Sequence, residues 1–236
     1  MINLEIDELL GKSIKDKELE LEFVYDNKNI LNKSTFVTLL NYCKSNYEFI
    51  DDNNYLDIRV KQGYNKLSNE RITVSNLHNI KKYCRNDILE EDVTFIKKEN
   101  IPGKRYVSDD FDFKFNLKKE IELSDDDENI IKIKENWESL LKFFRYKKRY
   151  SFLLPNKLFR IDLTIVKSSE YNNSTKSYMC YQKFRTADIL SKDELYEFEI
   201  EYVGNTNDDD KFLETYKSKG KDNNYQKLSP RLNYID

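Results

Sequence analysis

Two runs of the chain, far apart in the sequence, alternate glutamate with apolar residues. They are ELELEF at residues 18–23 and EFEIEY at residues 197–202. In a β-strand successive side chains point to opposite faces, so each run places its glutamates on one face and its apolar side chains on the other. Glutamate is depleted in strands, so any fold of this chain has to place both rows of carboxylates where water, opposite charges or a ligand can compensate them.

The same two-residue period recurs along most of the chain. Eight short strands are predicted, at 17–25, 55–62, 71–75, 91–99, 111–123, 143–154, 158–167 and 195–203. Helices are predicted at 33–46, 75–86 and 127–144, and the last two begin at the N-cap candidates Ser75 and Asp127. The chain therefore divides into one mainly β domain, residues 1–204, and a polar tail or linker to a following domain, residues 205–236.

Basic residues form rows of the same kind. Arg145, Lys147 and Arg149 share one strand face, and Arg160 shares a face with Asp162 on the next strand. The predicted helices carry apolar faces that must cover something, and the apolar face of the strands is their natural partner. If the sheet closes, its charged face becomes a lining. We therefore predict a mainly β (α+β) protein, a closed antiparallel eight-stranded β-barrel with a charged interior and helices packed outside.

Composition argues against several classes of site. His78 is the single histidine, which disfavours Ser-His and Cys-His catalysis and a histidine-based zinc site. Cys43, Cys84 and Cys180 are odd in number and widely spaced, so they indicate neither a disulfide framework nor a zinc cluster. The 40 basic and 43 acidic residues nearly cancel, which argues against attachment to nucleic acid by bulk charge. Catalysis must then rely on carboxylates, Lys, Arg and a metal that binds oxygen.

Nothing in the sequence points to a membrane. No apolar run approaches the ~20 residues that span a bilayer. The first residues, MINLEIDELL, lack the basic start and apolar core of a secretory signal. We expect a cytoplasmic, intracellular protein that acts as a monomer.

A closed lining of charged side chains has an energetic cost. Each unpaired buried charge is strongly destabilising, so the lining needs internal ion pairs or a charged ligand. A ligand with many negative charges would match the basic rows, and divalent cations would bridge it to the carboxylates. A polyphosphate has this chemistry.

The order and parity of these rows resemble the motifs of a known family. ELELEF and YEFEIEYVG resemble the paired glutamate motifs of the triphosphate tunnel metalloenzymes, in the branch of the metal-dependent RNA 5′-triphosphatases of fungi, protozoa and large DNA viruses. YKKRYSF and FRIDLT resemble the family's central basic strand and the strand after it, while DIRV and KFNLKKE resemble two further lining strands. The resemblance covers most of residues 17–204. Glu22 stands where the bacterial and animal branch has a lysine, which disfavours a thiamine triphosphatase or a class IV adenylate cyclase.

The resemblance implies catalytic roles for six carboxylates and a phosphate-binding role for several cations. Glu18, Glu20 and Glu201 match ligands of Mg²⁺ or Mn²⁺. The other matching carboxylates are Glu197 and Glu199, which would orient water or metal, and Asp162. The matching phosphate-binding positions are Arg59, Lys97 or Lys98, Lys114, Lys147, Arg149 and Arg160. The imperfect alternation at Ile96 leaves the choice between Lys97 and Lys98 open.

The implied reaction is hydrolysis of the γ-phosphate of triphosphate-ended RNA to a 5′-diphosphate end, the first step of mRNA capping, with nucleoside triphosphates as minor substrates. The implied setting is a virus-encoded, cytoplasmic or virion-associated capping enzyme, with guanylyltransferase and methyltransferase domains as candidate fused partners. Two alternatives stay open. One is an organic or inorganic tripolyphosphatase of the same fold, and the other is a non-enzymatic β-rich binding module whose glutamates are solvated.

Overall fold

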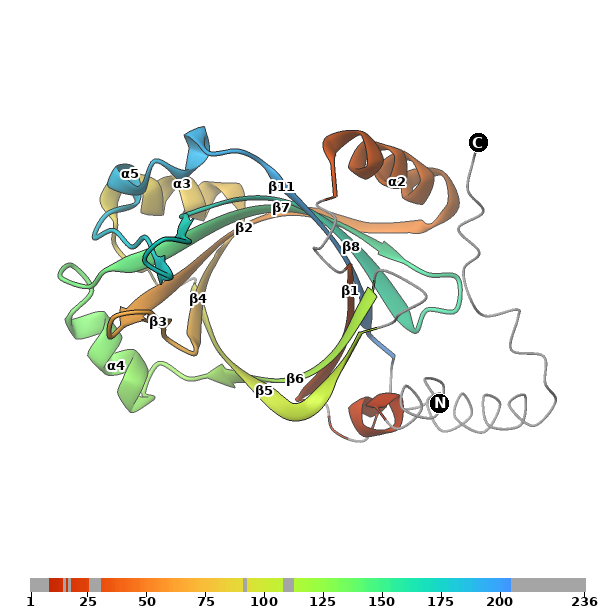
Figure 1. Ribbon diagram of the computed structural model, residues 1–236, viewed down its shortest axis with the longest axis horizontal. Coiled ribbons are helices and arrows are strands. Elements are labelled where there is room, and N and C mark those ends of the chain that lie inside the picture. Colours follow the sequence, from red (N-terminus) through yellow and green to blue (C-terminus); the bar gives the residue numbers. More distant parts are fainter. Residues whose placement is uncertain are drawn as a thin grey trace.

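The fold is organised around a ring of strands, seen end-on in Figure 1. The computed structural model describes residues 9–14, 16, 18–25, 31–90, 93–107 and 113–204. The strands of the ring are β1 (Leu19–Tyr25), β2 (Glu48–Gln62), β4 (Glu70–Ser75), β5 (Val93–Val107), β6 (Phe113–Leu123), β7 (Lys142–Leu153), β8 (Phe159–Ser168) and β11 (Leu195–Tyr202).

Strand pairing closes this ring. The order of neighbours is β2-β4-β5-β6-β1-β11-β8-β7, and β7 pairs in turn with β2. Each of these pairings is antiparallel. A short strand, β3 (Lys66–Leu67), pairs with the end of β2 outside the ring. The predicted closed eight-stranded barrel is confirmed, and each of the eight predicted strands contributes to it.

Strand β2 has an irregularity that decides which of its side chains face inward. Its register with β7 shifts between Phe49 and Asp51, so Phe49 lies opposite Phe152 whereas Asp51 lies opposite Ser151. The two phenylalanine rings meet edge to face on the outer side, with centroids 5.6 Å apart. Bulges of this kind are frequent at the rims of barrels. Asp51 consequently falls on the inner face.

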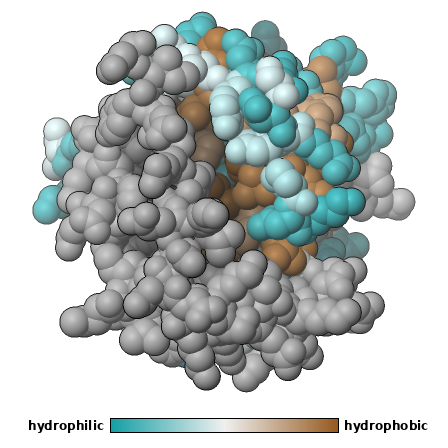
Figure 2. Space-filling view, turned by 90° about the vertical axis from the view of Figure 1, so that its right-hand side faces the viewer, coloured by the Kyte–Doolittle hydropathy of each residue, from teal (hydrophilic) through white to brown (hydrophobic). Residues whose placement is uncertain are grey.

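Helices cover the apolar outer face of the barrel and lie outside the ring in Figure 1. Helix α2 (Lys33–Asn46) packs Phe36 and Cys43 against Phe152 and Leu163 of β7 and β8. Helices α3 (Leu77–Asn86), α4 (Glu128–Glu135) and α5 (Phe184–Ala187) pack on β2, β4, β5 and β7. On the side shown in Figure 2, hydrophobic residues gather in a band bordered by hydrophilic residues.

Smaller elements complete the described part of the chain. The helical residues 9–14 pack on β1 and β6 through a third apolar cluster. The hairpin β9 (Tyr171–Asn172) and β10 (Ser177–Tyr178) follows β8, and the 3₁₀ turn η1 (Ile189–Ser191) precedes β11. Among the helices that the structure describes, none is long and apolar enough to cross a membrane. The predicted tail, residues 205–236, lies outside the described residues.

Two helix boundaries differ from those predicted. Ser75 is not an N-cap, because it pairs with Tyr55 as the last residue of β4. The N-cap of α3 is Asn76, whose side chain accepts a hydrogen bond from the Asn79 backbone N–H at 3.0 Å. Asp127 does cap α4 as predicted, but that helix ends at Glu135 because the chain turns before it enters β7.

We expect the outer apolar layer to carry much of the stability. Leu21 is 1% exposed within the cluster on β1, so Leu21→Ala should lower the free energy of unfolding by about 2–5 kcal/mol, through lost burial and the cavity left behind. Leu195→Ala is the matched control, because Leu195 is 46% exposed and should change it by less than about 0.5 kcal/mol. Urea denaturation measures both variants, and equal effects would contradict the assigned outer face.

Candidate active site

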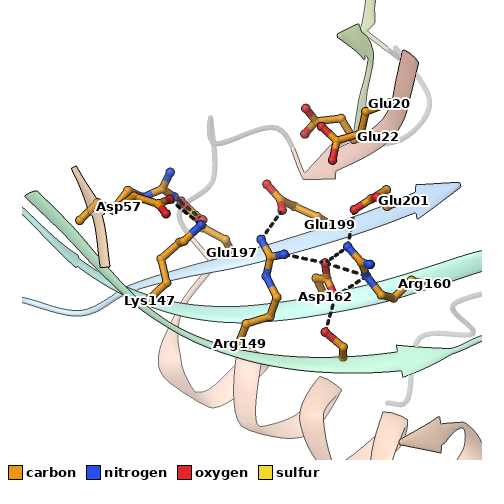
Figure 3. A network of polar contacts seen from close by, with 12 residues as sticks. Glu20, Glu22, Asp57, Lys147, Arg149, Arg160, Asp162, Glu197, Glu199 and Glu201 are labelled. Carbon is orange, nitrogen blue, oxygen red and sulfur yellow. Dashed lines mark hydrogen bonds and ion pairs between the residues drawn. The ribbon is translucent and has the colours of Figure 1, made fainter. Parts of the chain in front are cut away.

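Charged side chains from several strands point into the barrel (Figure 3). On β11, Glu199 lies opposite Asp162 of β8, and Glu201 lies opposite Arg160. On its other edge β11 pairs with β1, where Glu22 lies opposite Glu201. Because inward side chains recur at every second position, the register brings acidic and basic rows of neighbouring strands side by side.

Asp162 organises the basic part of the interior. Its side chain is 1% exposed and accepts a hydrogen bond from the Ser151 hydroxyl at 2.7 Å. Arg160 donates to it from Nε at 3.1 Å and from Nη2 at 3.0 Å, and Arg149 Nη1 lies 3.3 Å from its Oδ2. The other side of Arg149 approaches Glu199, with Nη2 3.8 Å from Oε2. One buried carboxylate thus fixes two guanidinium groups.

Lys147 and Asp57 form a buried ion pair further along the interior. Lys147 Nζ lies 2.6 Å from Asp57 Oδ2, and the Thr73 hydroxyl donates to Asp57 Oδ1 at 3.0 Å. Burial lowers the pKa of Lys147 to about 8, and nearby arginines such as Arg149 add to the lowering while Asp57 opposes it. Burial alone would raise the pKa of Asp57, but Lys147 and Arg71 outweigh burial, so that pKa lies below its ordinary value. The pair is therefore ionised at neutral pH.

Glu20, Glu22 and Glu201 form an acidic group where β1 and β11 meet, at the upper right of Figure 3. Each is already compensated by a cation of another strand. The pairs are Glu20 with Lys98, 3.2 Å between Oε2 and Nζ, Glu22 with Lys118, and Glu201 with Arg160.

Burial and mutual repulsion raise the pKa values of Glu201 and Glu22. Burial alone would also raise the pKa of Glu20, but Lys98 outweighs burial, so that pKa lies below its ordinary value. Burial raises the pKa of Glu201 to about 7, and the negative charge of Glu20 adds to the rise although Arg160 opposes it. Burial also raises the pKa of Glu22, with Lys118 opposing and Glu199 adding. More positive charge beside these carboxylates would favour their ionised forms.

The acidic group fits a divalent cation by its chemistry. Carboxylate oxygens are the ligands that Mg²⁺ and Mn²⁺ prefer, and a cation between Glu20 and Glu201 would relieve the repulsion that raises the pKa of Glu201. Within the described residues no three Asp, Glu, His or Cys side chains already stand at metal-ligand spacing. The three glutamates instead form ion pairs with the cations named above. To bind one metal ion, their carboxylates would have to move closer to one another.

Comparison with known proteins bears on the fold. No family model matches the sequence, and no curated protein matches it. The structure is similar to the RNA triphosphatase domain of a trifunctional mimivirus mRNA capping enzyme, with a TM-score of 0.62 and 24% identity over 91% of this chain and 92% of that chain. A triclinic structure of the mimivirus capping enzyme triphosphatase gives a TM-score of 0.60 and 21% identity over 92% and 93%. The S. pombe RNA triphosphatase Pct1 gives 0.51 and 14% over 91% and 82%. This chain shares the closed-barrel fold of these RNA triphosphatases, and the interior of its barrel is called the tunnel below.

The tunnel includes two of the three residues predicted as metal ligands and lacks the third. Glu18 precedes the first residue of β1 and lies on the outside, where its Oε2 is 2.6 Å from Lys119 Nζ and its side chain is 52% exposed. Glu22, by contrast, is buried opposite Glu201. The structure therefore groups Glu22, in place of Glu18, with Glu20 and Glu201.

Strand β5 decides the open choice between two lysines. Lys98 lies opposite Glu120 and pairs with it and with Glu20 inside the tunnel. Lys97 points outward, where its Nζ is 2.7 Å from Glu99 Oε1. Lys98 is thus the tunnel residue.

Other predicted phosphate-binding residues differ in position. Lys147, Arg149 and Arg160 lie in the network of Figure 3. Arg59 lies on the inward register of β2, but its Nε donates to the backbone carbonyl of Ser68 at 2.7 Å. Lys114 occupies an inward position of β6 opposite Val24.

Arg71 and Asp57 are among the charged residues of the tunnel that sequence reasoning missed. Arg71 Nη2 lies 3.5 Å from Glu120 Oε2, and Asp57 is the partner of Lys147. The available signal was the predicted strand 71–75, in which Arg71 and Thr73 share a face. No run of like residues surrounds either position, so each looked like an isolated charge.

We expect Asp57→Asn to destabilise the protein in a pH-dependent way. At pH 7 the change removes the counter-ion of Lys147, which must then either stay charged without a partner or give up its proton, and breaking a buried pair costs about 3–5 kcal/mol. At pH 9 the loss should be smaller, because Lys147, with a pKa of about 8 even in the intact pair, is then largely neutral. Urea denaturation at both pH values tests this. Asp52→Asn, on the same strand but 42% exposed, is the control, and a loss that does not depend on pH would contradict the expectation.

Proposed function

We propose that this protein is a metal-dependent polynucleotide 5′-triphosphatase that hydrolyses the γ-phosphate of triphosphate-ended RNA. One observation carries the proposal: inside a closed barrel, the acidic group Glu20, Glu22 and Glu201 stands beside the fixed cations Arg149 and Arg160. A triphosphate with divalent cations needs both kinds of partner in one enclosed space. The likeness in fold to the mimivirus RNA triphosphatase domain supports the proposal.

The cations of the tunnel would bind the phosphate groups. Arg149 and Arg160 present planar forks of N–H donors that match phosphate oxygens, and Asp162 holds both side chains in position. Lys147 adds a compact positive charge. Because these groups are held before substrate arrives, they can stabilise the charge of the transferred phosphoryl group without reorganising.

The acidic group would hold Mg²⁺ or Mn²⁺. When bound there, such a cation would neutralise charge on the phosphate oxygens and polarise the phosphoryl group. Glu20, Glu22 and Glu201 would be its ligands, which replaces Glu18 of the sequence-based set by Glu22.

Glu199 is the best-placed acceptor for the proton of the attacking water. Glu197 is held in an ion pair with Arg145, whereas the contact of Glu199 with Arg149 is looser, at 3.8 Å. Water attacks the γ-phosphorus, the bond to the β–γ bridging oxygen breaks, and Glu199 takes the proton. The products are a 5′-diphosphate RNA end and inorganic phosphate.

The cations of the tunnel would contact the phosphate groups of the substrate, which nucleoside triphosphates share with triphosphate-ended RNA. We therefore propose nucleoside triphosphates as further substrates. We also propose that the protein works in mRNA capping, beside a guanylyltransferase and a methyltransferase, and that it is virus-encoded. The similarity to a domain of a trifunctional mimivirus capping enzyme supports this setting.

The proposal is tested by release of phosphate from RNA that carries a 5′-triphosphate labelled at the γ position. We expect release with Mg²⁺ or Mn²⁺, a 5′-diphosphate RNA product, and no release once the metal is chelated. Release that does not need a metal would contradict the proposed reaction. So would release from inorganic tripolyphosphate with none from triphosphate-ended RNA.

The same assay tests the assignment of metal ligands. Glu20→Gln, Glu22→Gln and Glu201→Gln each remove an anionic ligand while keeping the side-chain shape, and should lower phosphate release by about 100-fold or more. Glu18→Gln is the control. It should change release by less than about twofold, as expected for a surface position. A loss in Glu18→Gln as large as that in Glu22→Gln would contradict the placement of Glu18 outside the tunnel.

A further inference from the structure

A pocket near one end of the tunnel is lined partly by the proposed phosphate-binding residues and partly by residues with no role in phosphate binding. The pocket has a volume of about 210 Å³. Its lining residues are Ile50, Asp51, Tyr55, Arg149, Ser151, Arg160 and Val203. Asp51, Ser151, Arg160 and Val203 lie near the ends of β2, β7, β8 and β11, toward one rim of the barrel, whereas Tyr55 and Arg149 lie midway along β2 and β7.

The lining of this pocket is cationic on the side of the tunnel and apolar on the other side. Arg149 and Arg160 belong to the tunnel and reach the pocket from inside. Ile50 and Val203 are apolar, and Ile50 is 46% exposed. Toward Ile50 and Val203 the lining is no longer cationic, so that side of the pocket suits the next group of the substrate rather than another phosphate.

Asp51 is the one acid among the residues that line this pocket. Its Oδ2 accepts a hydrogen bond from the Asn53 side chain at 2.9 Å. Its Oδ1 is buried and has no hydrogen-bond partner among the residues that the structure describes. A buried acceptor without a partner is destabilising, so the carboxylate has acceptor capacity left for a ligand.

The surroundings of Asp51 agree with a site for a neutral donor. Burial raises the pKa of the Tyr55 hydroxyl, the negative charge of Asp51 adds to the rise, and Arg149 opposes it. The Tyr55 ring faces the Arg149 guanidinium at 5.7 Å. A negative charge at this point repels a further phosphate and attracts an O–H or N–H donor.

We infer that Asp51 accepts a hydrogen bond from the ribose 2′-hydroxyl of the first nucleotide, and so selects nucleoside and RNA triphosphates over inorganic tripolyphosphate. The inference rests on the proposed function. In an RNA chain the 3′-oxygen is bonded to the next phosphate, which leaves the 2′-hydroxyl as the donor of that ribose. The same hydroxyl is the group by which proteins tell RNA from DNA.

The test compares hydrolysis of ATP, 2′-deoxy-ATP and tripolyphosphate. The wild-type protein should show kcat/KM about tenfold higher for ATP than for 2′-deoxy-ATP, as expected for one hydrogen bond to a charged group. Asp51→Ala should lower the value for ATP by about tenfold and leave 2′-deoxy-ATP and tripolyphosphate within about twofold. Asp51→Asn keeps one carbonyl acceptor and should retain part of the preference for ATP.

Asp52→Ala is the matched control. Asp52 is the next residue, points outward, and lies 3.8 Å from Lys148 Nζ, so all three substrates should behave as in the wild type. Equal wild-type rates on ATP and 2′-deoxy-ATP would overturn the inference. So would an Asp51→Asn variant, folded by its thermal melt, that loses activity equally on all three substrates.

Binding distinguishes this inference from the proposed function. Isothermal titration calorimetry of the wild type and the Asp51 variants with the non-hydrolysable β,γ-methylene analogues of ATP and 2′-deoxy-ATP, in Mn²⁺, makes the same comparison without turnover. A preference for ATP that depends on Asp51, without any hydrolysis, would remove the proposed function and keep the inference. Hydrolysis without such a preference would do the reverse.

Discussion

The compensation of charge across neighbouring strands is the constraint on which this structure depends. A closed barrel removes its inner face from bulk water, and an uncompensated charge there would cost several kcal/mol. The register meets this condition by placing Arg160 beside Glu201 and Lys147 within reach of Asp57. A slip of one residue in any strand would turn its charged row outward and its apolar row inward, so tunnel and fold are specified together.

Much of the fold could be predicted because two independent patterns agreed. Alternation in β1 and β11 placed Glu20 and Glu199 on a charged face, and the apolar faces of the helices required the opposite face of the strands as a partner. Closure of the sheet satisfies both conditions, with the helices outside and the charged face inside. The inward positions of Arg149 and Arg160 followed from the alternation of side chains along their strands alone.

The remainder depended on features that a single strand does not reveal. Glu18 continues the glutamate alternation, yet β1 begins one residue later, so its side chain is free to pair with Lys119 outside. Asp57 acquires its role only through Lys147 on another strand. Asp51 faces inward because of a register shift in β2, and no residue pattern marks that shift.

The internal ion pairs also bear on how the tunnel empties. Every phosphate oxygen that contacts Arg160 competes with Glu201, a carboxylate tethered to the same barrel and therefore present at a high effective concentration. An intact triphosphate engages several such cations at once, whereas a released phosphate engages few. The tethered carboxylates thus compete with inorganic phosphate for the same cations and favour its release. Once phosphate has left, the ion pairs between the tunnel side chains form again.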